Sequence, residues 1–442
     1  MKYWLSIFWF RQDLRIHDNR GLYFCIEQSR QVLPIFVFDD NILKNFPNKD
    51  NRLGFLVSAL QSLDSKLKNI WWNLHIRKWN PEEVFLKFFK KYKIDAIFTN
   101  RSYWPYGSKR DFLIAKLCKQ YGIDFNVYDD FLLVEPEQVS PTKVFTPYFK
   151  KWQKIDKKEM LPEPKNIDCP KIYIKPRIQI IKYLNYDKIF FWDINFTDQR
   201  LKNFNFSNYE DTRNLPYLDW SSRLSPYIRF WIISIRQLYH KVRASDNVWA
   251  QTFVSQLAWR DFWNHIFINF PETYFLEFQT KKRDIAWQNN EKLFESWKNW
   301  MTWYPIVDAG MRQLKQENRM HNRVRMITSS FLTKDLLIDR RRWERHFANY
   351  LLDYDSNLNT WNWQWAASVG ADPKPLRIFN PVLQAKRFDS HCEYIKKYIP
   401  ELRNINAKQI LDPLNNNLWY AAPVVNHYER SKLAKTLYYN IN

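Results

Sequence analysis

Residues 3–10, YWLSIFWF, form a short apolar run rich in residues that favour β-strands. Almost every side chain in the stretch is apolar, and aromatic and branched residues dominate it, which is typical of a strand buried on both faces. Three further stretches repeat the pattern: 32–38 (VLPIFVF), 94–99 (IDAIFT) and 123–128 (IDFNVY). Amphipathic segments that favour helices lie between them, at about 51–68, 81–92 and 108–121. Strands that alternate with helices predict an α/β domain with a parallel, Rossmann-like sheet over residues 1–130.

The hydrophobic period changes beyond residue 205. Apolar residues then recur at three- and four-residue spacing in RFWIISIRQLYHKV, FVSQLAWRDFWNHIF, VRMITSSFLTKDLLI and RRWERHFANYLL. This spacing predicts an all-α domain over residues 205–442. Residues 131–204 carry many prolines and lysines without a clear period, so we expect them to connect the two domains.

The chain has 68 Lys and Arg residues against 46 Asp and Glu, a net charge of +22. A surplus of this size favours a polyanionic partner such as nucleic acid, whereas the alternative is a charge spread evenly for solubility. The 22 tryptophans exceed the needs of an ordinary core and indicate surfaces on which bases stack.

The cysteines and the start of the chain bear on its location. Cys25, Cys118, Cys169 and Cys392 are scattered, which argues against a disulfide framework or a zinc site and fits a reducing compartment. The apolar start is too short for a signal peptide, and no window reaches the length of a membrane span. We therefore expect a cytoplasmic protein with no membrane partner.

The densest charge lies at residues 319–345. Within this run, Asn322, Arg325 and Met326 fall on one face of a predicted helix. Such a face either recognises a ligand or buries a satisfied amide in the core.

A second helix places Gln256, Trp259, Arg260 and Trp263 on one face. An indole with an arginine and an amide can hold a base by stacking and hydrogen bonding. The alternative is a packed aromatic stripe.

Two carboxylates, Asp353 and Asp355, precede alternating indoles at 361, 363 and 365. The carboxylates could accept hydrogen bonds from ribose hydroxyls, pair with Arg325 or bind a metal. No His or Cys accompanies them, so a metal is the least favoured of the three.

Eight segments that run through nearly the whole chain resemble the photolyase/cryptochrome family, closest to class I cyclobutane pyrimidine dimer photolyases: WFRQDLRIHDN (9–19), KVFTPYFKKW (143–152), SSRLSP (221–226), QLAWRDFW (256–263), YPIVDAGMRQL (304–314), MHNRVRMITSSFLTKDLLID (320–339), WQWAASVGADPKPLRIFNP (363–381) and YIKKYIPELR (394–403). The resemblance implies a carbon–carbon lyase that repairs these dimers with light, by electron transfer from reduced FAD to a flipped-out lesion.

The resemblance also implies which residues hold FAD in the helical domain. The positions that match the family's motifs are Tyr209, Ser221, Ser222, Arg223, Leu224, Ser225, Gln256, Trp259, Arg260, Asn322, Arg325, Asp353, Asp355 and Asn359. The SSRLS segment and Arg260 would bind the diphosphate. Asp355 would accept from the flavin edge, Asp353 would pair with Arg325, and Asn359 would face flavin N5.

UV-damaged DNA is the partner that the resemblance implies, with the protein acting as a monomer. The flipped lesion would enter a slot walled by Trp259 and Trp365, with Met326 and Asn322 nearby. The remaining positions that match DNA-holding or lesion-contacting residues of the family are Arg213, Arg323, Gln384 and Gln256.

The match fails at two positions of the helical domain. Gln256 stands where cyclobutane-dimer enzymes carry Glu, and (6-4) photolyases carry Gln there too, so the lesion preference could differ. The MHNR motif, however, lacks the paired histidines of the (6-4) branch. The family reduces its flavin through three indoles, here Trp363, residue 340 and Trp287, but residue 340 is Arg. Because a fixed cation opposes a neighbouring radical cation, we suggest a detour through Trp343 or Trp361.

A second chromophore is the other open point. The folate site of the family expects Glu where this chain has Gly107, whereas Phe36, Asp39, Arg52 and Tyr106 resemble the deazaflavin-binding branch. An 8-hydroxy-5-deazaflavin is therefore favoured over methenyltetrahydrofolate. The alternative is an α/β domain that is scaffold only, with no second chromophore.

Two other classes of protein compete. A cryptochrome-type blue-light photoreceptor is favoured by Gln256 and Arg340 and opposed by the short stretch after the last helix. A basic nucleic-acid-binding protein without a cofactor is opposed by SSRLS and by the two neighbouring carboxylates, Asp353 and Asp355.

Overall fold

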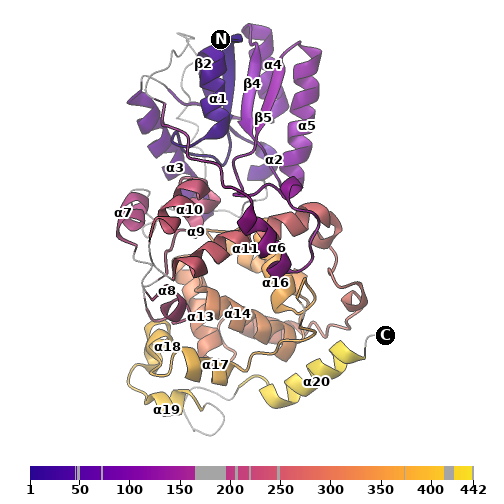
Figure 1. The fold of residues 1–442 in the computed structure, drawn as a ribbon. Coiled ribbons are helices and arrows are strands. Elements are labelled where there is room, and N and C mark those ends of the chain that lie inside the picture. The colour runs from indigo at the N-terminus through magenta and orange to yellow at the C-terminus, as the bar shows by residue number, and fades with distance from the viewer. Residues whose placement is uncertain are drawn as a thin grey trace.

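An α/β region is followed by a helical region, as Figure 1 shows. This arrangement confirms the expected fold class. The computed structural model describes residues 1–44, 46, 50–70, 73–164, 196–204, 208–218, 221–245, 249–372, 374–412 and 423–440, and of residues 196–198 and Trp343 the backbone alone.

Parallel strands form one sheet in the order β3-β2-β1-β4-β5. Their bounds are β1 (Tyr3–Phe10), β2 (Ser29–Phe38), β3 (His75–Lys78), β4 (Ala96–Asn100) and β5 (Asp124–Tyr128). The central strand is β1, in which Ile7 pairs with Leu33 of β2 and with Ile97 of β4. The helices of this region are α1 (Arg20–Gln28), α2 (Asp40–Leu43), α3 (Asn51–Lys68), α4 (Pro81–Lys91) and α5 (Pro105–Gln120).

Alternate side chains of β1 enter two separate cores, because successive residues of a strand point to opposite faces. Phe8 and Phe10 pack with apolar residues of α1 and α3, while Ile7 and Trp9 pack with those of α4 and α5. Helices therefore cover both faces of the sheet (Figure 1), which explains why β1 is apolar along nearly its whole length.

Several elements differ from the sequence reading. Strand β3 is only HIRK, too short and too basic to form an apolar run, and its place in the sheet comes from pairing with β2. Helix α1 was not expected either. The expected connector contains α6 (Phe145–Lys154), which buries Tyr148 and Trp152. Residues 165–195 lie outside the described residues, so the expected domain boundaries stay predictions.

The helical region carries the rest of the secondary structure. Its elements are α7 (Phe196–Asn203), α8 (Tyr209–Thr212), α9 (Ser225–Arg229), α10 (Ile235–Arg243), α11 (Ala250–Asn269), α12 (Glu291–Lys298), α13 (Pro305–Glu317), α14 (Asn322–Ser330), a π-helical turn (Phe331–Asp335), α15 (Arg340–Tyr350), α16 (Ser356–Ala366), α17 (Pro381–Phe388), α18 (Glu393–Tyr398), α19 (Ala407–Ile410) and α20 (His427–Tyr439), with short 3-10 turns between them.

Buried ion pairs join the two regions. Arg236 of α10 donates from Nη2 to Asp130, just after β5, at 2.6 Å and lies 3.0 Å from Asp18. Arg15, which follows β1, also pairs with Asp130 and donates to the carbonyl of Trp231 at 3.0 Å. The carboxyl ends of β1 and β5 therefore face the helical region.

Candidate functional site

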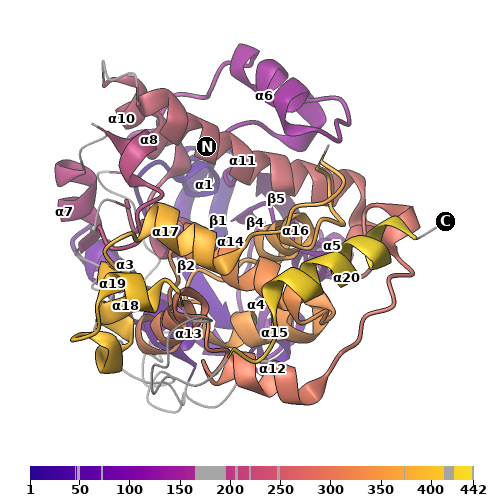
Figure 2. The same ribbon diagram turned by 90° about the horizontal axis from the view of Figure 1, so that it is seen from below.

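Three helices of the helical region carry most of the predicted site residues, and Figure 2 shows α16 near both α11 and α14. Helices α11 and α16 are joined by a hydrogen bond of 3.1 Å from Asn357 Nδ2 to Asn264 Oδ1. The indoles of Trp263 and Trp361 stack between the same helices, with centroids 5.6 Å apart and planes at 8°. For Trp263, the interpretation as a packed aromatic is therefore the correct one.

Asp355 is the buried N-cap of α16. Its Oδ1 accepts from the backbone N–H groups of Asn357 at 3.0 Å and Leu358 at 3.1 Å, while Oδ2 lies 3.7 Å from Arg229 Nε. Arg229 also donates to the carbonyl of Tyr354 at 2.7 Å. One carboxylate oxygen is thus committed to the helix, and the other faces cations.

Two guanidinium groups, those of the buried Arg260 and the half-buried Arg229, lie beside this carboxylate. Arg260 donates to the carbonyl of Phe131 at 2.8 Å and lies 3.8 Å over its ring. Burial lowers the pKa of Arg260 and of Arg229; Asp261, 3.5 Å from Arg260, opposes the shift of Arg260, and Asp355 opposes both shifts. The two guanidinium groups are donors of the kind that an anionic group such as a diphosphate accepts from. No local pattern in the sequence singled out Arg229.

The SSRLS segment adds a second group of cations. Arg319 donates to Ser221 Oγ at 3.4 Å, and Arg200 donates to the carbonyl of Ser221 at 2.7 Å. Burial and the nearby Arg223 lower the pKa of Arg319. Arg223 itself has a left-handed backbone, with φ of 52°. Because α9 is only five residues long, hydroxyls and guanidinium groups would carry anion binding here more than the helix dipole.

The other residues of the predicted FAD set lie around this segment. Ser222 Oγ accepts from the N–H of Leu224 at 3.4 Å, and Leu224 is buried whereas Ser225 is exposed. Tyr209 of α8 is half-buried, its ring centroid 5.3 Å from that of Phe253 in α11.

The predicted pair of Arg325 and Asp353 is confirmed. Arg325 Nη2 lies 3.1 Å and 3.0 Å from the two carboxylate oxygens of Asp353, and Nε donates to the carbonyl of Met320 at 2.8 Å. This pair ties α14 to the segment that leads into α16.

Asn359 of α16 is buried. Its Oδ1 accepts from Trp363 Nε1 at 3.2 Å, and its Nδ2 has no hydrogen-bond partner among the described residues. A buried amide donor without a partner is costly, so this group fits a ligand acceptor or a further acceptor nearby.

The expected lesion residues are partly exposed. Trp259 is half-buried and stacks on Phe145 of α6 with centroids 3.7 Å apart. Asn322 is exposed and makes a contact of 3.8 Å with Met326 Sδ, so the alternative of a satisfied core amide is wrong. Trp365 is half-buried, with Arg377 5.0 Å from its ring centroid.

The expected DNA-holding residues lie beside α8, α14 and α17. Arg323 donates to Asn214 Oδ1 at 2.7 Å, and burial together with Arg213 and Arg387 lowers its pKa. Gln384 Oε1 is buried with no partner among the described residues. Gln256 donates to Ser255 Oγ at 3.3 Å, a weak local contact that leaves it available.

Arg340 is fully buried and is not an isolated cation. It donates to Glu277 at 2.7 Å and to Glu344 at 3.3 Å. Arg340 therefore faces two carboxylates and is not the bare cation that was expected to oppose a radical at residue 340. Trp363 is buried, with Phe347 at 5.3 Å between centroids, and Trp287 is half-buried. The side chain of Trp343 lies outside the described residues.

Two of the predicted antenna residues, Asp39 and Tyr106, meet where β2 ends. Tyr106 donates to Asp39 at 2.6 Å, and burial together with this carboxylate raises the pKa of Tyr106 to about 12. Phe36 is buried, and Arg52 lies 5.6 Å over the ring of Tyr354 in the helical region. Arg110 lies 3.8 Å from Asp39.

Gly107 has a steric reason to be glycine. A Cβ at this position would lie 1.9 Å from Ser102 Oγ, a distance that no side chain tolerates. A glutamate at residue 107 would therefore require Ser102 to move.

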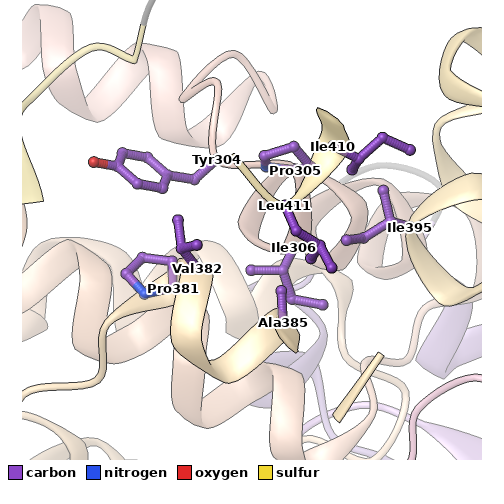
Figure 3. Close-up of a pocket in the computed structure, with 9 residues that line it drawn as sticks. All are labelled: Tyr304, Pro305, Ile306, Pro381, Val382, Ala385, Ile395, Ile410 and Leu411. Atoms are coloured by element: carbon purple, nitrogen blue, oxygen red, sulfur yellow. The ribbon is translucent and has the colours of Figure 1, made fainter. Parts of the chain in front are cut away.

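An apolar hollow lies apart from these polar groups, between α13, α17, α18 and α19 (Figure 3). It is lined by Tyr304, Pro305, Ile306, Pro381, Val382, Ala385, Ile395, Ile410 and Leu411. The hydroxyl of Tyr304 donates to the carbonyl of Val425 at 3.0 Å and points away from the hollow. Such a lining offers nothing to a charged ligand.

Among the described residues, no helix combines the length and apolarity that a bilayer crossing requires.

Known proteins match the whole chain. A family model described as "DNA photolyase" matches residues 6–165, and one described as "FAD binding domain of DNA photolyase" matches residues 253–440. A deoxyribodipyrimidine photo-lyase of Synechococcus is 35% identical and aligns over 98% of this chain and 96% of the relative.

Solved structures agree with these matches. An archaeal photolyase from Sulfolobus tokodaii, described with two FAD molecules, has a TM-score of 0.91 and 32% identity over 99% of this chain and 100% of its own. A class III photolyase from Agrobacterium tumefaciens has a TM-score of 0.92 and 30% identity over 100% and 98%. Fold, site and matches define an FAD-binding enzyme with an α/β region ahead of a helical one. The chain belongs to the DNA photolyase family.

Proposed function

We propose that this protein repairs cyclobutane pyrimidine dimers in DNA with light, by electron transfer from reduced FAD to a flipped-out lesion. One observation carries the proposal: α11, α14 and α16 combine a buried, cation-rich site around Asp355 with the exposed Asn322 and the half-buried Trp259. We expect the enzyme to act as a monomer in the cytoplasm.

The residues present fit FAD. Arg260 and Arg229 beside Asp355, and Arg319 at Ser221, would hold the anionic diphosphate and the polar edge of the flavin. Arg325, held by Asp353, and Asn359 would border the ring. Bound FAD in its reduced form would supply the light-driven one-electron chemistry that splitting of the dimer needs. The chain's own contribution is to hold and orient the flavin and the lesion and to exclude water from the site.

The lesion site follows from stacking and charge. Trp259, backed by Phe145, and Trp365 would face the flipped bases, and Asn322 would hydrogen-bond their edges. Arg213 and Arg323 would neutralise phosphates next to the lesion, and Gln384 would add an amide contact. Gln256 would contact the lesion as an uncharged amide. This uncharged contact supports an alternative in which the enzyme repairs (6-4) products or has another altered lesion preference.

A second chromophore would lie at the Tyr106 and Asp39 contact, with Phe36 and Arg52 beside it, and a deazaflavin is the favoured class. The stacking of Arg52 on Tyr354, the residue before Asp355, supports this position, because it brings the two chromophore sites close together. A second flavin is the alternative, since the Sulfolobus tokodaii relative is described with two FAD molecules.

A cryptochrome-type photoreceptor is the second candidate, and Gln256 and Arg340 are the observations that favour it.

The deciding experiment illuminates the reduced protein with single- and double-stranded DNA that contains dimers or (6-4) products. We expect the dimers to disappear with light and to persist in the dark. Persistence of both lesions in the light would overturn repair and favour the photoreceptor.

Replacing Trp259 with Ala should weaken binding of dimer-containing DNA. Base–aromatic stacking contributes roughly 1–3 kcal/mol per base, so affinity should fall roughly 5- to 150-fold. Fluorescence anisotropy with damaged and undamaged duplexes measures this affinity. The control is Trp79→Ala, which removes an exposed indole of the α/β region and should leave binding unchanged. Equal affinity of the two variants would contradict the assignment of Trp259.

A further inference from the structure

A buried cluster of charges lies around Arg340, at the start of α15. Arg340 is fully buried, donates from Nε to Glu277 Oε2 at 2.7 Å and donates from Nη1 to Glu344 Oε2 at 3.3 Å. Thr360 donates to the other carboxylate oxygen of Glu344. The cluster therefore joins the turn after α11 to α15 and α16.

The charges of the cluster do not balance. Two carboxylates surround one guanidinium, which leaves one negative charge in excess when both are ionised. Glu277 Oε1 and Arg340 Nη2 are buried and have no hydrogen-bond partner among the described residues. An unbalanced buried charge is costly, and a group in this position usually takes up a proton instead.

The surroundings support a bound proton. Burial raises the pKa of Glu277 and of Glu344, and Arg340 only partly opposes this shift. Asp339 and Arg341 act on Glu277, and Arg283 donates to the backbone carbonyl of Glu277. The tyrosines coupled to the two carboxylates are Tyr274, Tyr354 and Tyr438. Asp339 and Arg341 pair with each other, so they add little net charge.

The cluster adjoins Asn359. The amide of Asn359 is close enough to Glu344 to lower the pKa of that carboxyl, while its Nδ2 lacks a hydrogen bond in this arrangement. An ionised Glu344 attracts Nδ2, and this leaves Oδ1 with Trp363 Nε1. A protonated Glu344 loses this attraction.

We propose that Glu277 and Glu344 share one proton around Arg340, and that the location of this proton orients the Asn359 amide beside the FAD site. With the proton on Glu277, Glu344 is ionised and holds Asn359. With the proton on Glu344, the amide is released. The proton exchanges with solvent and no electron moves, so the process needs no further reactant. The part that concerns Asn359 rests on the proposed function, because it assumes FAD at this site.

Infrared spectroscopy of the full chain with its bound flavin, labelled with carbon-13 glutamate, tests the shared proton. Near neutral pH, we expect a carboxylic acid band that Glu277→Gln and Glu344→Gln each remove. Glu317→Gln is the matched control, since Glu317 accepts from Tyr398 and its pKa is lowered, so the band should persist. Persistence of the band in both cluster variants would overturn the shared proton.

Glu135 supplies an internal reference, because burial raises its pKa to about 8 and it should give a separate acid band. If a cluster variant does not fold, Glu135→Gln tests the shared proton instead. This variant removes the reference band, so the acid band that remains near neutral pH must come from Glu277 or Glu344. A spectrum of that variant without any such band would also overturn the proposal.

The absorption spectrum of the bound flavin tests the effect on Asn359. We expect a pH-dependent shift whose midpoint matches the loss of the acid band, present in Glu317→Gln and absent in both cluster variants. A flavin absorption spectrum that does not change while the acid band is lost would overturn the role of the cluster at Asn359. A protein with this titration that repairs no dimer would overturn the proposed function alone.

Discussion

Replacing Arg236 with Met is expected to lower the free energy of unfolding by about 3–5 kcal/mol. Arg236 is buried between Asp18 and Asp130, donating to Asp130 at 2.6 Å and to Asp18 Oδ2 at 3.1 Å. Removal of the guanidinium leaves Asp18 without its cation in a dry interior and gives Asp130 only Arg15 as a partner. Because these carboxylates follow β1 and β5, the loss also loosens the contact between the α/β and helical regions.

Urea denaturation followed by circular dichroism measures this effect. The matched control is Arg341→Ala, which breaks an ion pair whose arginine side chain is 49% exposed. Exposed pairs contribute about 0–1 kcal/mol, so the control should unfold nearly as the unmodified chain does. Equal losses in the two variants would show that the buried network does not hold the regions together.

Replacing Asp355 with Asn should release flavin from a protein that remains folded. Asn caps a helix as well as Asp does, so α16 should keep the bonds that Asn357 and Leu358 donate. The negative charge between Arg229 and Arg260 is lost, together with a charge-assisted hydrogen bond to the flavin edge. Such bonds contribute about 1.5–3 kcal/mol, so flavin affinity should fall roughly 10- to 150-fold.

The ratio of flavin to protein absorbance after gel filtration measures this loss, and the melting temperature reports folding. Asp339→Asn is the control, because Asp339 caps α15 in the same way outside the site. Asp355→Ala should lose both the cap and the flavin. Full flavin content in Asp355→Asn would remove Asp355 from the proposed FAD site.

Local pattern predicted the parts of the fold in which burial is continuous. The strands β1 and β2 are apolar because helices cover both faces of the sheet, and α3 was predicted with the bounds that it has. Strand β3 and helix α1 have weaker patterns, since HIRK buries only two side chains fully and α1 buries one narrow face. Their formation depends on the neighbours that they pair or pack with.

Site residues were predicted as far as motif and spacing reach. The pairing of Arg325 with Asp353 was expected and is present. Arg229 was not singled out, and Arg319 was named only as part of the charged run at 319–345, because their role depends on which carboxylates and hydroxyls the fold brings next to them. Arg340 was expected to act as a lone cation, and only the fold places Glu277, more than sixty residues earlier in the chain, against it.

The amino-acid sequence by itself determined the α/β region, the helical region after it and the family, because hydrophobic period and long motifs are local properties of a chain. Tertiary structure decided which charges meet: the network of Arg236, the cations beside Asp355 and the carboxylates around Arg340. Charge pairing and desolvation depend on distances in space between groups far apart in sequence, and no periodicity records those distances.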